Sequence, residues 1–110
     1  MIYELKNKAS TSEEGEAILG FQDTGSHTCY MIYGILKPKE KGRVIKPGEG
    51  HEEIVIALKG NLKVKGFYSG ILNEGYAIHI KGNEECFFEN VDESEALYII
   101  AGGHLERGHH

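Results

Sequence analysis

The sequence predicts an all-β sandwich or barrel built from short strands. Apolar runs rich in β-branched and aromatic residues recur at short intervals along the 110 residues, and turn-forming clusters separate them. The chain contains 15 glycines and shows no segment with a helical hydrophobic period, which favours the same class. Because we find neither an internal repeat nor a linker, we expect one domain with one core.

The first part of the chain predicts two short strands joined by a polar loop. Ile2–Leu5 has the composition of a short edge strand, and Asn7–Gly15 is polar enough to be a loop. Ala17–Phe21 is the next strand candidate, and a turn cluster follows in Gln22–Ser26. His27–Leu36 then forms a long aromatic strand that suits the wall of a barrel, with Cys29 expected in the core.

The segment Arg43–Gly60 is the one around which the rest of the chain is organised. Pro47–Gly50 predicts a loop, because proline lacks a backbone donor and the glycines leave the backbone loose. Ile54–Leu58 is apolar throughout, as in a strand buried on both faces. If this strand begins at His51, then His51 and Glu53 point to the same face, which continues inward along the run.

The second half of the chain predicts a series of short strands. Lys59–Asn61 is a turn signal, and Leu62–Gly66 alternates apolar with charged residues, so a hairpin between this strand and the preceding one is the natural interpretation. The remaining apolar runs, separated by turn signals, are Phe67–Tyr68, Gly70–Leu72, Tyr76–Ile80, Cys86–Phe88 and Ala96–Ala101.

Composition and charge exclude several classes of partner. The net charge is -5 and the lysines are scattered among glutamates, so no basic stripe is available to follow a phosphate backbone. No apolar segment approaches the roughly 20 residues that a membrane span requires, and the first residues lack the features of a signal peptide. We therefore expect a cytoplasmic protein, with no nucleic-acid or membrane partner, whose two cysteines are thiols.

Two spacing patterns stand out between Gly42 and Asn90. Six residues separate Glu53 from Gly60, and Gly42 precedes them; Cys86 then follows Gly75 by 11 positions and precedes Asn90 by four. These patterns resemble the two motifs of the cupin superfamily. The resemblance covers roughly residues 30–101 and implies a cupin-like jelly-roll barrel, the double-stranded β-helix. It also allows a homodimer.

The resemblance divides the chain into one domain and a tail. Residues 1–103 form the single barrel domain, with residues 1–26 as its N-terminal strands and loops. Residues 104–110 form a His-rich C-terminal tail that takes up metal adventitiously or is a remnant of purification.

The metal-ligand positions of the cupin motifs are poorly retained. Cupins commonly hold a divalent metal with a His-x-His pair, a glutamate and a second-motif histidine. Here the pair would fall within Lys46–Glu49, which contains no histidine, and Cys86 takes the place of the fourth ligand. Of the usual set only Glu53 remains.

A metal site built from other residues is one of two alternatives for this region. A carboxylate, an imidazole and a thiolate from Glu53, His51 and Cys86, with Glu49 as a further ligand, could hold zinc, iron, nickel or manganese. The alternative is that metal binding was lost, which would leave His51 on a rim, Glu53 hydrogen-bonded to a neighbour and Cys86 as an inert small hydrophobe. His79 either joins the pocket or faces solvent.

Three functional hypotheses follow. The first is a binding module for a small polar molecule, held in a barrel pocket lined by Glu49, His51, Glu53, His79 and Cys86. The second is a metal-dependent enzyme of the oxygenase or isomerase type, with Glu53, His51 and Cys86 around a divalent metal. The third is a stable interaction protein with a vestigial pocket. Fold alone does not choose among them, because this fold supports many unrelated activities.

Overall fold

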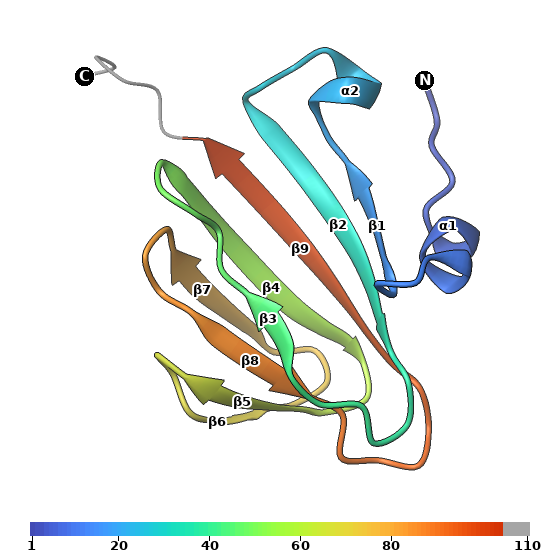
Figure 1. The fold of residues 1–110 in the computed structure, drawn as a ribbon, viewed down its shortest axis with the longest axis vertical. Helices are drawn as coiled ribbons and strands as arrows, with labels where there is room; N and C mark the ends of the chain where they lie inside the picture. Colours follow the sequence, from blue (N-terminus) through green and yellow to red (C-terminus); the bar gives the residue numbers. More distant parts are fainter. Residues whose placement is uncertain (105–110) are drawn as a thin grey trace.

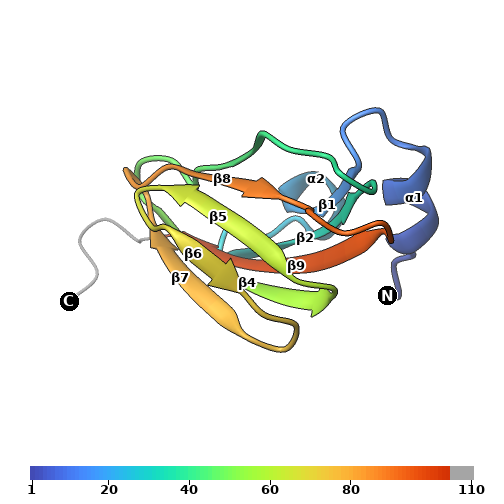
Figure 2. The same ribbon diagram turned by 90° about the horizontal axis from the view of Figure 1, so that it is seen from below.

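The computed structural model describes residues 1–104, which form two antiparallel sheets packed face to face (Figures 1 and 2). The larger sheet has the order β1-β2-β9-β4-β7, and its strands are β1 (Glu16–Leu19), β2 (Cys29–Leu36), β9 (Ala96–His104), β4 (His51–Lys59) and β7 (Ala77–Lys81). The smaller sheet has the order β3-β8-β5-β6, and its strands are β3 (Arg43–Ile45), β8 (Cys86–Glu89), β5 (Leu62–Gly66) and β6 (Gly70–Leu72). The predicted all-β class is confirmed.

The core lies between the two sheets and follows the alternation of each strand. On β4, Glu53, Val55 and Ala57 are buried, whereas Ile54 and Leu58 keep 53% and 47% of their surface exposed. The predicted inward face of this strand is therefore confirmed, but burial on both faces is wrong for a single copy of the chain. Cys29 is also exposed at the start of β2, so its expected place in the core is wrong.

Two short helices lie in the N-terminal part, where the sequence predicted strands and loops. They are α1 (Lys6–Thr11) and α2 (Phe21–Thr24), and Ile2–Leu5 is not a strand. Helix α1 has six residues and buries only Ala9. Its sequence therefore shows no hydrophobic period from which a helix could be predicted. The helix lies beside β1 and β2 (Figure 1). Its Ala9 joins the buried Ala17 and Ile35 on the outer face of the larger sheet. Neither of these helices could cross a membrane, since both are far too short.

The turn at Gly60 connects the two sheets and does not form a hairpin. Strands β4 and β5 belong to different sheets, so the predicted pairing between them is wrong. The backbone N–H of Gly60 donates to Glu74 Oε1 at 2.7 Å, and Asn61 Oδ1 accepts from the backbone N–H of Glu74 at 2.8 Å. These bonds tie the crossing to the turn between β6 and β7. The same turn residues serve a hairpin or a crossing, so local sequence does not distinguish the two.

Asn90, the last residue of the second motif, has a structural role. Its side chain is fully buried, and its Nδ2 donates to the carbonyl oxygens of Leu36, Lys37 and Ser94 at 3.3, 3.1 and 2.8 Å. Its Oδ1 accepts from the backbone N–H of Asp92 at 3.1 Å. Buried backbone carbonyls need such partners, so this asparagine joins the end of β2 to the loop before β9.

Strands β2 and β9 interlock through two glycine–tyrosine pairs. Gly34 on β2 is the register partner of Tyr98 on β9, and Tyr30 on β2 is the partner of Gly102 on β9. A Cβ atom added at Gly34 would lie 2.1 Å from the Tyr98 ring, and one added at Gly102 would lie 2.0 Å from the Tyr30 ring. Each ring therefore lies directly over a glycine of the neighbouring strand.

We predict that Gly102→Ala lowers the free energy of unfolding by about 2 kcal/mol or more, because the methyl group would displace the Tyr30 ring. Urea denaturation measures the change. The matched control is Gly103→Ala, since a Cβ there would have its nearest contact at 4.0 Å. Equal effects of the two substitutions would contradict the interlocking contact.

Candidate functional site

Two polar clusters lie along β2 and β9, one near each end of the sandwich. We name the first the Arg43 cluster (Glu16, Glu40, Arg43 and Tyr98) and the second the Tyr30–Glu53 cluster (Tyr30, His51, Glu53 and His104). Each contains one of the tyrosines that lie over a glycine.

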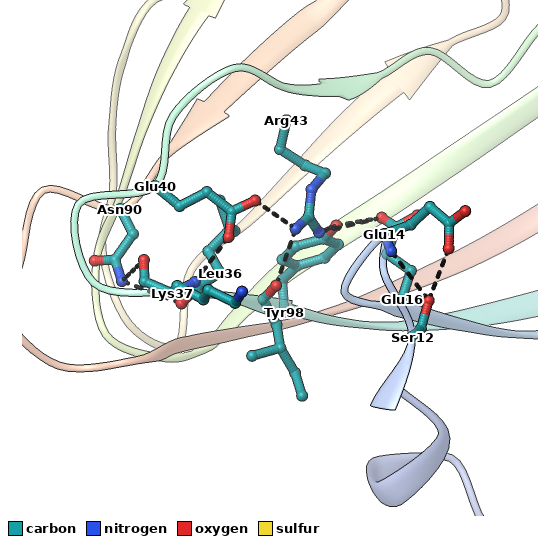
Figure 3. A network of polar contacts seen from close by, with 10 residues as sticks. Ser12, Glu14, Glu16, Leu36, Lys37, Glu40, Arg43, Asn90 and Tyr98 are labelled. Atoms are coloured by element: carbon teal, nitrogen blue, oxygen red, sulfur yellow. Dashed lines mark hydrogen bonds and ion pairs between the residues drawn. The ribbon is translucent and has the colours of Figure 1, made fainter. Parts of the chain in front are cut away.

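The Arg43 cluster is closed by its own contacts (Figure 3). Nη1 of Arg43 donates to the Tyr98 hydroxyl at 2.8 Å, and Nη2 donates to Glu40 Oε2 at 2.8 Å and to the Ile35 carbonyl at 3.0 Å. The Tyr98 hydroxyl in turn donates to Glu16, whose Oε2 lies 3.8 Å from Nη1. Burial and the charge of Glu16 raise the pKa of Tyr98, so the phenol stays protonated. The guanidinium thus has its partners within the protein.

The Tyr30–Glu53 cluster is only partly satisfied. The Tyr30 hydroxyl donates to Glu53 Oε2. The His51 ring lies between two others, with centroids 5.8 Å from Tyr30 and 4.7 Å from His104, its register partner on β9. Within residues 1–104, Nδ1 of His51 is buried and has no hydrogen-bond partner. Buried polar atoms without a hydrogen-bond partner are rare in folded proteins.

Electrostatics make Glu53 unusual among the carboxylates. It keeps only 6% of its surface exposed, and burial raises its pKa, with a further contribution from the charge of Glu16. The bond from Tyr30 and the proximity of His51 act in the opposite direction without cancelling the effect of burial. Because the folded-state pKa exceeds the unfolded one, the stability contributed by this carboxyl is lost as pH rises through the folded-state pKa.

Of the predicted site residues, the structure brings together His51 and Glu53. They share the inner face of β4, as the alternation predicted. Cys86 is buried in the core on β8, in the opposite sheet. Glu49 is exposed in the turn that precedes β4.

His79 takes the second of its two predicted placements and faces solvent. It is the register partner of Ile54, so it lies on the outer face of the larger sheet, opposite to Glu53. Its Nε2 lies 2.7 Å from Oε1 of Glu52, and about half of its side chain is exposed. Its inclusion among the residues that line the pocket is therefore corrected.

The predicted metal site is not assembled among the described residues. Within residues 1–104, no group of three or more His, Cys, Asp or Glu side chains is arranged to hold one. His51 and Glu53 adjoin, but Tyr30 occupies one oxygen of Glu53. The ligand set of His51, Glu53 and Cys86 is thus not assembled. The remainder of the predicted tail, residues 105–110, lies outside the described residues.

Two members of the cluster were missed by sequence reasoning. Tyr30 was assigned to an aromatic core strand, and its contact with Glu53 depends on pairing across β9, which no local pattern reveals. His104 was assigned to the tail, whereas it is the last residue of β9 and pairs with His51. The sequence feature that could have placed His104 in this strand is the apolar run Ala96–Ala101, because the strand continues from it through Gly102 and Gly103.

A surface cavity beside the Arg43 cluster is less suited to a ligand. It measures about 420 Å³ and lies between α1 and the segment 37–40. Two of its cations are engaged: Arg43 as described, and Lys39, whose Nζ contacts the Val91 carbonyl at 2.7 Å and Glu93 at 3.1 Å. The Tyr30–Glu53 cluster is therefore the better candidate site.

Comparisons with known proteins agree with this architecture. No family model matches the sequence, and no curated protein matches it. The protein TT1209 from Thermus thermophilus has a similar structure, with a TM-score of 0.69 and 23% identity over 96% of this chain and 98% of that one. An oxalate oxidase gives a TM-score of 0.70 and 20% identity over 86% of this chain.

This chain spans only about half of the oxalate oxidase, 54% of its length. The cupin domain of Schizosaccharomyces pombe Cnp3 gives a TM-score of 0.67 at 8% identity, over 81% of this chain and 63% of that one. Identities at this level establish the fold alone. The chain therefore has the fold of the cupin superfamily, the double-stranded β-helix, as the motif resemblance implied.

Proposed function

We propose that the protein binds a small polar molecule at the Tyr30–Glu53 cluster. The observation that carries this proposal is the pair of incompletely satisfied polar groups there: Glu53 is almost fully buried, and Nδ1 of His51 has no partner within the described part of the chain. His104 at the edge of the cluster is exposed, so the cluster extends to the surface.

The physical argument rests on the cost of these groups. A buried carboxylate and a buried imidazole nitrogen lose hydration on folding, and one hydrogen bond from Tyr30 restores only part of it. A ligand that completes their hydrogen bonds would recover that loss. Because the groups are held by β4 and β9 within the barrel, little further ordering is needed on binding.

A metal-dependent enzyme is the alternative function. An oxalate oxidase and a predicted oxalate decarboxylase from Thermotoga maritima are among the similar structures, so an oxygenase or isomerase using His51, Glu53 and Cys86 around zinc, iron, nickel or manganese is the competing hypothesis. It has less support, because residues 1–104 contain no assembled ligand group. A barrel with a vestigial pocket is the third hypothesis.

We predict that compounds from a panel of small polar molecules raise the melting temperature of the full chain, and that Glu53→Gln abolishes the shift, because it removes the buried charge. The control is Glu52→Gln, the neighbouring carboxylate on the outer face. Elemental analysis accompanies the screen. Near-stoichiometric metal that falls in both Glu53→Gln and Cys86→Ala, with both variants folded, would establish the metalloenzyme alternative. If no compound shifts the melting temperature and no metal is bound, the hypothesis of a vestigial pocket remains.

We also propose that the protein is a homodimer, joined through the outer face of the larger sheet. Helix α1 covers the part of this face near Ala17 and Ile35, and other apolar side chains on the face stay exposed in the described part of the chain. There Met31, Ala101 and Ile54 are cross-strand neighbours on β2, β9 and β4, and Met31 and Ile54 are 39% and 53% exposed. A second copy covering this surface would account for the apolar character of β4 on both faces.

We predict that size-exclusion chromatography with light scattering gives twice the chain mass for the wild type and the chain mass for Ile54→Lys, because a buried lysine without a partner opposes association. Val44→Lys is the matched control, since Val44 is similarly exposed, at 52%, on the smaller sheet. A monomeric wild type, or equal dissociation by both variants, would contradict this interface.

A further inference from the structure

The two polar clusters contain the same arrangement of three residues across neighbouring strands. In each, a tyrosine crosses a glycine of the adjacent strand and donates its hydroxyl proton to a glutamate on the strand beyond. The rows are Glu16 (β1), Gly34 (β2) and Tyr98 (β9) in the Arg43 cluster, and Tyr30 (β2), Gly102 (β9) and Glu53 (β4) in the other. Registers, glycine contacts and hydrogen bonds agree in both rows.

The rows differ in what approaches the tyrosine–glutamate pair. At Tyr98 and Glu16 it is the Arg43 guanidinium, which donates to the phenol oxygen and lies 3.8 Å from the carboxylate. Within residues 1–104, Tyr30 and Glu53 form no bond or ion pair with a lysine or an arginine. The same acid–phenol pair thus has a cation partner in one row and none in the described part of the other.

The unsatisfied positions at Glu53 are suited to accept hydrogen bonds. Oε1 of Glu53 receives no hydrogen bond from the described residues, and the Tyr30 oxygen, having donated its proton, retains lone pairs, as Tyr98 does when it accepts from Arg43. Nδ1 of His51 accepts when the proton is on Nε2. Three acceptors on neighbouring side chains fit a group with several N–H donors.

We propose that the small polar molecule is an organic cation bearing a primary ammonium or guanidinium group, which binds Tyr30 and Glu53 as Arg43 binds Tyr98 and Glu16. This inference rests on the proposed function and names its ligand class. A cation with N–H donors both offsets the buried charge of Glu53 and fills the acceptors. A neutral polyol would supply donors but not charge, and a carboxylate would be repelled by Glu53.

Calorimetric titration of the full chain with four small probes at constant ionic strength tests the proposal. Methylammonium and methylguanidinium carry charge and N–H donors, tetramethylammonium carries charge alone, and ethylene glycol carries neutral donors alone. We expect saturable binding of the first two at one site per chain and none of the last two. The ring resonances of Tyr30 and His51 should shift during the same titrations followed by NMR.

Variants locate the binding. We expect Glu53→Gln to weaken it at least tenfold, because charge-assisted bonds are lost. Tyr30→Phe keeps the ring over Gly102 and removes one acceptor, so we expect a loss of about threefold to tenfold. Glu52→Gln, on the opposite face of β4, should leave affinity unchanged. Tyr30→Phe serves as the test if Glu53→Gln does not fold.

The outcomes separate the two levels of the proposal. One outcome is that ethylene glycol, or acetate added as an anionic probe, binds in a Glu53-dependent way while the N–H cations do not bind. This result would keep the proposal that a polar molecule binds at this site and would overturn the proposal that the ligand is a cation. Equal binding of tetramethylammonium would show nonspecific attraction to charge and also overturn it. Binding that no variant alters would place the cation elsewhere. If no probe and no compound of the wider panel binds, the proposed function fails as well.

Discussion

The contact between β2 and β9, in which a tyrosine of each strand lies over a glycine of the other, is the constraint on which both polar clusters depend. Gly34 and Gly102 have no side chain, so the rings of Tyr98 and Tyr30 can pass over them and reach the strand beyond. Without these crossings the hydroxyl groups would not meet Glu16 and Glu53. One backbone pairing thus places a carboxylate–phenol pair near each end of the sandwich.

The two ends then differ in how their charges are neutralised. Near the start of β3, Arg43 neutralises its neighbours, and Asn90 satisfies the adjacent loop carbonyls, so this end is stabilised by the protein's own groups. Near the start of β4, Glu53 is buried with a raised pKa and His51 has an unbonded nitrogen in the described structure. Departures from complete hydrogen bonding concentrate at functional sites, which is why we propose a ligand site at this end.

Sequence reasoning succeeded where the information was local and failed where it depended on strand pairing. The alternation that places His51 and Glu53 on one face is a property of β4 alone, and the motif spacings from Gly42 to Asn90 predicted the fold. The chain crossing at Gly60 and the contact from Tyr30 to Glu53 depend on which strands become neighbours. The motif also could not show that Cys86 lies in the core of the opposite sheet.

The central claim is that Glu53 is a buried carboxylate whose charge and hydrogen bonding are completed by a bound organic cation. Its most direct test is a pH titration of the Glu53 side-chain carboxyl by carbon-detected NMR, with and without methylguanidinium. The account predicts a pKa above that of an ordinary glutamate in the free protein, because of burial, and a decrease when the cation is added. An ordinary pKa that the cation leaves unchanged would contradict it.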